Sequence, residues 1–365
     1  MTRSHTPGLR VTATLAALLV PAVSAHAQTE RTAGETYKNV QVLKDVPASI
    51  FMNTMFFQRY SLGVSCNYCH VGAEWARDDK PQKLKAREML RMVLDINKSH
   101  FDGKVAVNCM TCHRGLPKPQ TDIVGKRTSI QEMLGPRPTQ QPQPSPVLPA
   151  VDDVLAKYIA AIGGADALSK IRSRATRGNM ITGEGAIVPF EDTWAAAPAS
   201  TLSIRHFGGS LGDFATGFDG TAGWNSDNRG FTPQAGQAKA QLEMNAQFED
   251  KLNLRKLYAE LTVTGIEPVN DAPAIVLSAK SVVTGRAERL YFDVATGLLV
   301  RRSIVTEGLF GSFTTDTYYE NYRTVDGVTL PIMISEFTPD FGTIRKITSV
   351  EHNGTIDRAV FTRSK

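Results

Sequence analysis

Two copies of one short pattern contain all four cysteines of this chain: Cys66-Asn67-Tyr68-Cys69-His70 and Cys109-Met110-Thr111-Cys112-His113. The pattern C-x-x-C-H is the attachment signal for c-type haem. Two thiols at this spacing can add to the two vinyl groups of one porphyrin, and the adjacent histidine can then bind the iron. A chain with two such motifs is expected to fold around two large cofactors. We expect two covalent haem c groups, attached through Cys66, Cys69, Cys109 and Cys112 and bound at iron by His70 and His113.

A zinc ribbon and a redox-active C-x-x-C pair are the alternatives to haem. Zinc knuckles usually stand about 15–20 residues apart, whereas 39 residues separate Cys69 from Cys109. Neither alternative requires a histidine directly after each second cysteine. The sequence therefore favours haem.

The first 27 residues have the pattern of a secretory signal peptide. Arg3 and Arg10 precede an apolar stretch over residues 11–23, and Ala25-His26-Ala27 is an A-x-A cleavage site. The apolar run is shorter than the roughly 20 residues that a membrane-spanning helix needs. We therefore expect cleavage of residues 1–27, no membrane span and a periplasmic location, where haem attachment also takes place.

A proline-rich segment divides the rest of the chain. Residues 135–150 contain six prolines in sixteen residues, a composition typical of a semi-rigid spacer. With 365 residues and 42% hydrophobic content, the chain can build more than one core. We expect a di-haem cytochrome c domain over residues 28–134, a linker over 135–150 and a second, independently packed domain over 151–365. The net charge of +5 is only a weak indication of nucleic acid, and we expect no such partner.

The haem domain is predicted to be mainly α-helical. Residues 47–49 begin a helix that continues to about residue 60 and is closed by Gly63, and Pro81 stands in the first turn of a second helix. In the second helix, Met89, Val93 and Ile96 recur at helical spacing. The polar residues on the same helix are expected to face outward: Lys83, Arg87, Arg91 and Lys98.

Methionines on these helices are candidates for the iron ligand opposite each histidine. From the residues alone, Met52 and Met55 are equal candidates for the first haem, as are Met89 and Met92 for the second, since a methionine on an apolar helix face usually serves core packing. His100 at the helix end is a further candidate ligand. Arg114, directly after His113, is a candidate partner for a haem propionate.

Six segments between Tyr37 and about Pro119 carry a resemblance to a known family: KNVQVL, FMNTM, CNYCHV, DDKPQK, AREMLRMVLDIN and CMTCHRG. In this order they resemble one haem pair of the tetrahaem cytochrome subunit of purple-bacterial photosynthetic reaction centres. The resemblance implies that each iron lies between the motif histidine and a methionine on the preceding helix, which gives Met55 for the first haem and Met89 for the second. It also implies redox partners such as a membrane reaction centre or a quinol-oxidising complex.

The second domain shows short β-prone runs from about residue 174, separated by turn signals such as Asn270-Asp271 and Asp326-Gly327. Helices are expected from Asp153 to Ile162 and from Gln237 to Leu261. This pattern predicts an α+β domain on an antiparallel sheet, open or curved into a half-open barrel. It faintly resembles the periplasmic lipoprotein-carrier folds, and we take only the fold from that resemblance.

An electron carrier without enzymatic activity is the predicted function. Two alternatives remain: a di-haem enzyme such as a peroxidase, which needs a displaceable iron ligand, and a haem-sensing binding module that acts through the C-terminal domain. The C-terminal domain lacks H-E-x-x-H and phosphate-loop motifs. Its His206 and His352 are expected to be structural.

Overall fold

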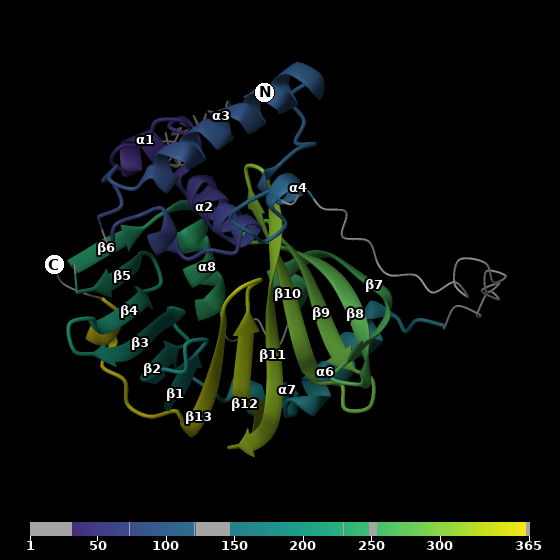
Figure 1. Ribbon diagram of the computed structural model, residues 1–365. Coiled ribbons are helices and arrows are strands. Elements are labelled where there is room, and N and C mark those ends of the chain that lie inside the picture. Colours follow the sequence, from purple (N-terminus) through teal and green to yellow (C-terminus); the bar gives the residue numbers. More distant parts are fainter. Residues whose placement is uncertain are drawn as a thin grey trace, which may run out of the picture.

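The computed structural model describes residues 31–72, 74–119, 121, 147–228, 230–247 and 254–362. The predicted signal peptide and most of the proline-rich linker lie outside these ranges. Figure 1 shows a group of helices that carries both C-x-x-C-H motifs above a large, strongly curved sheet. No helix in the described ranges is long and apolar enough to cross a membrane.

The helices of the motif-bearing region follow local signals in the sequence. They are α1 (Ala33–Thr36), α2 (Ala48–Leu62), the 3-10 turn η1 (Cys66–Tyr68), α3 (Pro81–His100) and α4 (Cys109–His113). Gly63 ends α2 with φ 60, a left-handed conformation that suits glycine. Pro81 occupies the first turn of α3, where its missing N–H is not needed. The predicted starts and ends of both long helices are confirmed.

The C-terminal domain contains thirteen strands within the described residues. They are β1 (Ser173–Thr182), β2 (Ile187–Ala195), β3 (Ser200–Gly208), β4 (Gly212–Phe218), β5 (Gly223–Asp227), β6 (Gly230–Gln234), β7 (Tyr258–Val269), β8 (Ala272–Ser281), β9 (Ala287–Asp293), β10 (Leu299–Gly308), β11 (Gly311–Val325), β12 (Val328–Phe337) and β13 (Gly342–His352).

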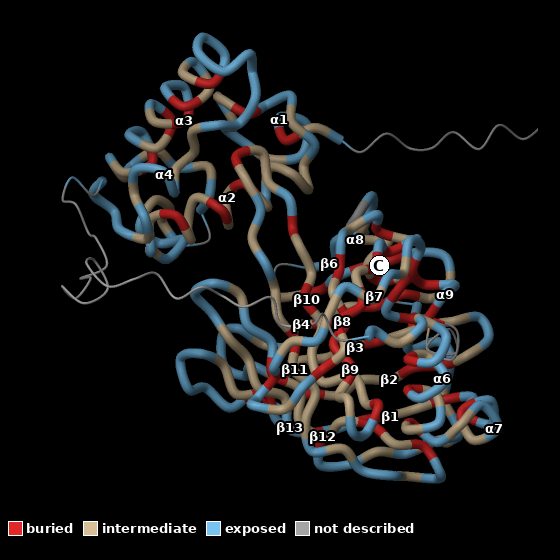
Figure 2. Tube along the Cα trace, turned by 90° about the vertical axis from the view of Figure 1, so that its right-hand side faces the viewer, coloured by how far each residue is buried: buried red, intermediate tan, exposed pale blue. Residues whose placement is uncertain are grey.

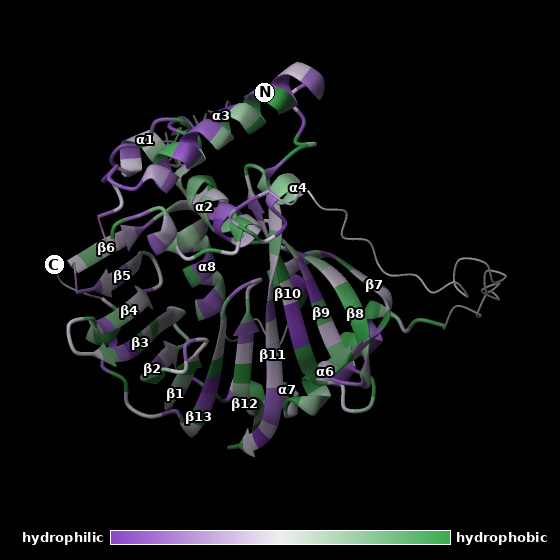
Figure 3. Ribbon diagram, viewed as in Figure 1, coloured by the Kyte–Doolittle hydropathy of each residue, from purple (hydrophilic) through white to green (hydrophobic). Residues whose placement is uncertain are grey.

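These strands form one antiparallel sheet in the order β6-β5-β4-β3-β2-β1-β13-β12-β11-β10-β9-β8-β7. The last strand pairs with the first, since Arg174 lies opposite His352. The edges β6 and β7 stay unpaired with each other, so the sheet is curved but not closed, as predicted. Positive φ angles at Asn270, Asp271 and Asp326 place the predicted turn residues in tight hairpins. Apolar and polar residues alternate along many of the strands (Figure 3).

The helices of this domain differ from the prediction in two respects. They are α6 (Val151–Ala161), α7 (Gly164–Ser169), α8 (Gly236–Ala246), α9 (Leu254–Leu257) and the 3-10 turn η3 (Arg358–Phe361). The single helix predicted from Gln237 to Leu261 is wrong, because β7 begins at Tyr258 and pairs with β8 from that residue onward. A strand partner decides the conformation of this segment over its local pattern. Likewise, Ala150 and not Asp153 precedes the first turn of α6.

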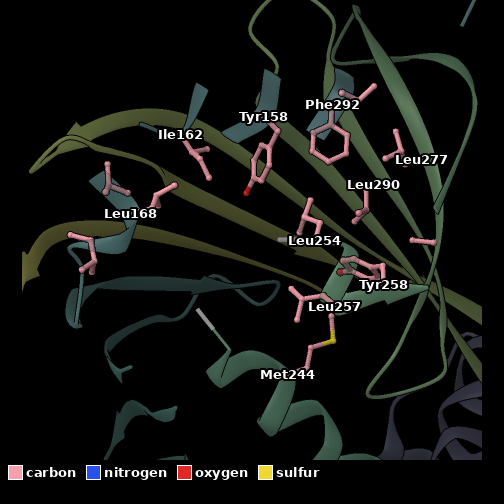
Figure 4. Close-up of a cluster of buried hydrophobic side chains, with 14 of the residues drawn as sticks. Tyr158, Ile162, Leu168, Met244, Leu254, Leu257, Tyr258, Leu277, Leu290 and Phe292 are labelled. Carbon is pink, nitrogen blue, oxygen red and sulfur yellow. The ribbon is translucent and has the colours of Figure 1, made fainter. Parts of the chain in front are cut away.

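The main core of the domain lies between the sheet and α6, α7 and α9. Tyr158 of α6 packs edge to face on Phe292 of β9 with ring centroids 5.3 Å apart. Figure 4 shows Leu277, Leu290 and Leu254 gathered around this pair. The helices thus cover one face of the sheet.

The two regions are packed together rather than independent. The hairpin between β10 and β11 rises from the sheet to the helices (Figures 1 and 2), and its tip residue Phe310 is 1% exposed in a cluster with Phe57 of α2 and Leu90 of α3. The bounds of the two domains stay a prediction, whereas this contact between them was not predicted. A contact between residues this far apart in the chain leaves no local signal in the sequence.

Candidate haem attachment sites

The first C-x-x-C-H motif lies in a tight turn after α2. Cys66 begins η1, and His70 follows it with its N–H bonded to the carbonyl of Cys66 at 3.0 Å. The Nδ1 atom of His70 lies 3.2 Å from the carbonyl oxygen of Trp75, whose ring packs edge to face on the imidazole. Burial lowers the pKa of His70, which favours the neutral imidazole that binds a metal.

The second motif forms the short helix α4. The Asn108 side chain accepts the N–H of Thr111 at 3.1 Å and the Thr111 hydroxyl accepts the N–H of Asn108 at 3.1 Å, which closes a capping box. The Nδ1 atom of His113 lies 3.0 Å from the carbonyl oxygen of Leu116. Gly115 donates its N–H to the carbonyl of Ser61 at 2.8 Å, so this motif is attached to the end of α2.

Both histidines therefore have the same environment at Nδ1. A backbone carbonyl can only accept a hydrogen bond, so each Nδ1 is assigned the proton and each Nε2 keeps its lone pair. This is the arrangement that orients a histidine for binding a metal through Nε2. The four cysteines form no disulfide with one another, and within the described ranges no three His, Cys, Asp or Glu side chains are grouped to hold a metal ion. Two separate thiol pairs, each with an oriented histidine, fit two haem c groups.

A buried polar network supports the first histidine. Lys83 of α3 donates to the carbonyl oxygens of Trp75 at 2.8 Å and Arg77 at 2.7 Å, and it pairs with Asp78 at 3.0 Å. Arg87, one turn later on the helix, donates to Asp78 at 2.8 Å. These hydrogen bonds, with one from Asn39, hold the pKa of Asp78 well below its usual range. The carbonyl of Trp75 thus contacts both Lys83 and His70.

The prediction that Lys83 and Arg87 face outward is wrong, since each is only 9% exposed. Arg91 and Lys98 are exposed as predicted. One side of α3 carries Lys83, Arg87, Leu90 and Asn97 at helical spacing. This spacing is the signal in the sequence that could have predicted the burial of the two cations. The carboxylate that neutralises the two cations lies outside the helix, and its position depends on the tertiary fold.

The four candidate methionines differ in burial. Met55 is half-buried and packs against the cluster that contains Phe57, Leu90 and Cys109, and Met89 is half-buried as well. Met52 and Met92 are exposed by 37% and 42%. The side chains of α2 that are most buried are Thr54, Phe57 and Ser61, because this side of α2 faces the hairpin and Gly115. Iron ligation by Met55 and Met89 stays a prediction.

The remaining candidates lie at the surface or in ion pairs. Arg114 is exposed at the end of α4 with φ 49, and its role toward a propionate stays a prediction. His100 is exposed at the last position of α3. His206 pairs with Asp213 at 3.0 Å. His352 has both ring nitrogens engaged, with Asp326 at 3.1 Å and Arg174 at 2.9 Å.

Comparison with known proteins confirms the resemblance of the N-terminal region. A family model described as photosynthetic reaction centre cytochrome C subunit matches residues 2–161. The photosynthetic reaction center cytochrome c subunit of Thermochromatium tepidum is 43% identical over 93 residues, which are 24% of this chain and 23% of that protein. Cytochrome c-554 of Chloroflexus aurantiacus is 40% identical over 88 residues, covering 22% of this chain and 20% of that protein. The chain thus spans about a quarter or less of the length of these two relatives.

Solved structures are similar to the C-terminal domain. A LolA superfamily protein from Nitrosomonas europaea covers 58% of this chain and 97% of its own, with 13% identity and a TM-score of 0.41. A putative outer membrane lipoprotein-sorting protein domain from Vibrio parahaemolyticus covers 57% of this chain and 94% of its own, with 10% identity and a TM-score of 0.42.

Proposed function

We propose that this chain, whose N-terminal region is similar to reaction centre cytochrome c subunits, is a periplasmic di-haem c-type cytochrome that carries single electrons between redox partners. One observation carries the proposal: in both C-x-x-C-H motifs the histidine Nδ1 contacts a backbone carbonyl, at 3.2 Å for His70 and 3.0 Å for His113. An imidazole oriented in this way presents Nε2 to an iron. The family match of the same region supports the same cofactor.

When bound, each haem supplies an iron that accepts and releases one electron. The residues of the chain hold and tune that iron. Cys66 and Cys69 anchor the first haem covalently, and Cys109 and Cys112 anchor the second. The Trp75 and Leu116 carbonyls fix the imidazoles and make them better electron donors to the metal.

We assign Met55 and Met89 as the ligands opposite His70 and His113. Both methionines are half-buried, whereas their neighbours Met52 and Met92 are more exposed. A thioether ligand raises the reduction potential relative to a second imidazole. If a histidine and a methionine of this chain hold each iron, no position would be left for peroxide, which favours electron transfer over a peroxidase. The relatives named for reaction centres suggest a membrane reaction centre or a quinol-oxidising complex as partner.

Haem content gives the first test of this proposal. Acidified extraction of the matured protein should leave two haems bound to the chain. The double variant Cys66→Ala/Cys69→Ala, which removes both thiols of the first motif, should retain only one haem. His100→Ala is the matched control, because this exposed histidine is the alternative iron ligand of the same region. A matured protein that retains one haem or none would refute the proposal.

Potentiometric titration tests the axial ligands. Met55→Ala and Met89→Ala should each lower the potential of one haem and remove one sulfur-to-iron bond, seen as loss of part of the weak red absorption band of the oxidised protein. Met52→Ala and Met92→Ala are the matched controls, three residues away on the same helices, and should keep both potentials. The reverse result would show that the ligand register is wrong.

A further inference from the structure

The hairpin between β10 and β11 reaches into the core of the haem domain. Its tip residues are Leu309 and Phe310, between Gly308 and Gly311, which are paired across the hairpin. Phe310 is 1% exposed and belongs to the cluster formed by Leu43 and Phe57 with two residues of α3. At this depth an aromatic side chain is part of the core and not a surface contact. The haem domain therefore takes one of its core side chains from the C-terminal domain.

The approach of the tip to α2 is very close. A Cβ atom added at Gly311, where φ is 148, would lie 2.8 Å from the Phe57 ring and 3.5 Å from the side-chain nitrogen of Asn108. Any larger residue at this position would therefore clash with the Phe57 ring. The tip thus touches the helix before the first motif and the cap residue of the second.

Hydrogen bonds fix the tip to the turn of α2 that carries Met55. The backbone N–H of Leu309 donates to the Thr54 hydroxyl at 3.0 Å, and this hydroxyl donates to the Ile50 carbonyl at 2.7 Å. The side chain of Asn53 donates to the carbonyl of Glu307 at 2.9 Å. Thr54 is fully buried, so loss of its oxygen would leave the Leu309 N–H without its partner in an apolar setting.

A second contact holds the end of α2 to the sheet. Arg59 pairs with Asp340, after β12, at 2.9 Å. The Tyr60 ring packs edge to face on Phe313 of β11, with centroids 4.9 Å apart. Both ends of the Met55 segment are therefore attached to the C-terminal domain, and rotation of α2 about its axis would break contacts at each end.

We propose that the β10–β11 hairpin is a positioning element of the first haem site, with Phe310 and Thr54 holding α2 in the rotation that directs Met55 to its ligand position. This inference rests on the proposed function, because it takes Met55 as the ligand of the first iron. Met55 packs against the cluster that contains Phe310, so we expect a change at the tip to reach the thioether through this cluster. The C-terminal domain then takes part in setting the potential of one haem. Phe310 and Thr54 are positioning residues and do not themselves bind iron.

The test uses the full, haem-loaded protein and two substitutions at the tip contact. In Phe310→Ala the core contact is lost, and in Thr54→Val the shape is kept while the hydroxyl is removed. We expect each to lower the potential of the haem assigned by Met55→Ala and to weaken its share of the red absorption band. Both haems should stay attached, and the potential of the other haem should change less. Phe310→Leu and Thr54→Ser, which restore apolar volume and hydroxyl respectively, should recover the original potential.

Phe361→Ala is the control for stability alone. Phe361 is also 1% exposed but packs in the C-terminal domain with Leu202 and Trp224, so its loss should destabilise the protein without moving either potential. If the unaltered protein shows the red absorption band while Phe310→Ala and Thr54→Val leave both haem potentials unchanged, that result would overturn this inference and leave the proposed function intact. Absence of the band from the unaltered protein would overturn the methionine assignment and this inference together.

Discussion

Lys83 offers a sharp test of how the first haem site is supported. Its ammonium donates to the carbonyl oxygens of Trp75 and Arg77 at 2.8 and 2.7 Å, and the first of these also contacts His70. Lys83→Met keeps the buried aliphatic part of the side chain and removes the charge. Hydrogen bonds to charged groups contribute about 1.5–3 kcal/mol each. The two bonds together predict a loss of about 3 kcal/mol in the free energy of unfolding, since part of the desolvation cost of the ammonium is recovered.

Urea unfolding of the haem-loaded protein, followed by circular dichroism, measures this loss. The matched control is Lys85→Met, two residues away on α3, where the exposed pair with Glu88 should contribute less than about 1 kcal/mol. Because the Trp75 carbonyl keeps His70 as its partner, we also expect the potential of the first haem to shift while the second stays constant. Equal stability losses in the two variants would refute the argument that Lys83 is part of the site.

Three further outcomes follow from named contacts. Gly63→Ala should destabilise the protein by about 1–3 kcal/mol in the same assay, because the residue has φ 60 and its Cβ would lie 2.1 Å from the Gly115 carbonyl oxygen; an unchanged midpoint would contradict the packing of α2 on the second motif. Glu288→Gln should cost about 3–5 kcal/mol, because it removes the buried charge that pairs with half-buried Arg302 at 2.6 Å. Glu267→Gln, at an exposed pair with Arg289, should cost under about 1 kcal/mol. Burial and the nearby Arg174 lower the pKa of His352 in the folded protein. As the pH falls below about 6.5, the unfolded chain therefore takes up a proton before the folded protein does. The free energy of unfolding should decrease between that pH and the pKa of folded His352, and His352→Gln should flatten this decrease in unfolding curves measured at several pH values.

Local signals in the sequence were sufficient for the long helices and the haem motifs. Gly63 and Pro81 mark the boundaries of α2 and α3 through backbone chemistry that acts within one turn. The two C-x-x-C-H motifs need no tertiary information, since their spacing matches one cofactor. The alternating runs and turn residues likewise predicted an antiparallel, unclosed sheet.

Features that depend on distant partners were not predictable in this way. Lys83 and Arg87 are residue types that usually lie on an exposed helix face. Their burial is stable only because Asp78 lies close enough to neutralise their charges. The segment from Gln237 to Leu261 has a helical pattern throughout, yet pairing with β8 makes its last part a strand. The hydrogen bond between Thr54 and Leu309 joins residues 255 positions apart, a contact that periodicity cannot reveal.

The position of Phe310 in the chain also has a consequence for the order in which the protein is made. Synthesis proceeds from the N-terminus, so both C-x-x-C-H motifs emerge long before the hairpin that completes their domain. During that interval the cluster of Leu43, Phe57 and Leu90 lacks its aromatic partner, and α2 has no Leu309 to bond. We expect the N-terminal helical region to be loosely packed until the hairpin has been synthesised. The cysteines would then be accessible to a haem-attaching enzyme on a flexible segment. Packing of the hairpin against α2 afterwards would stabilise the haem sites.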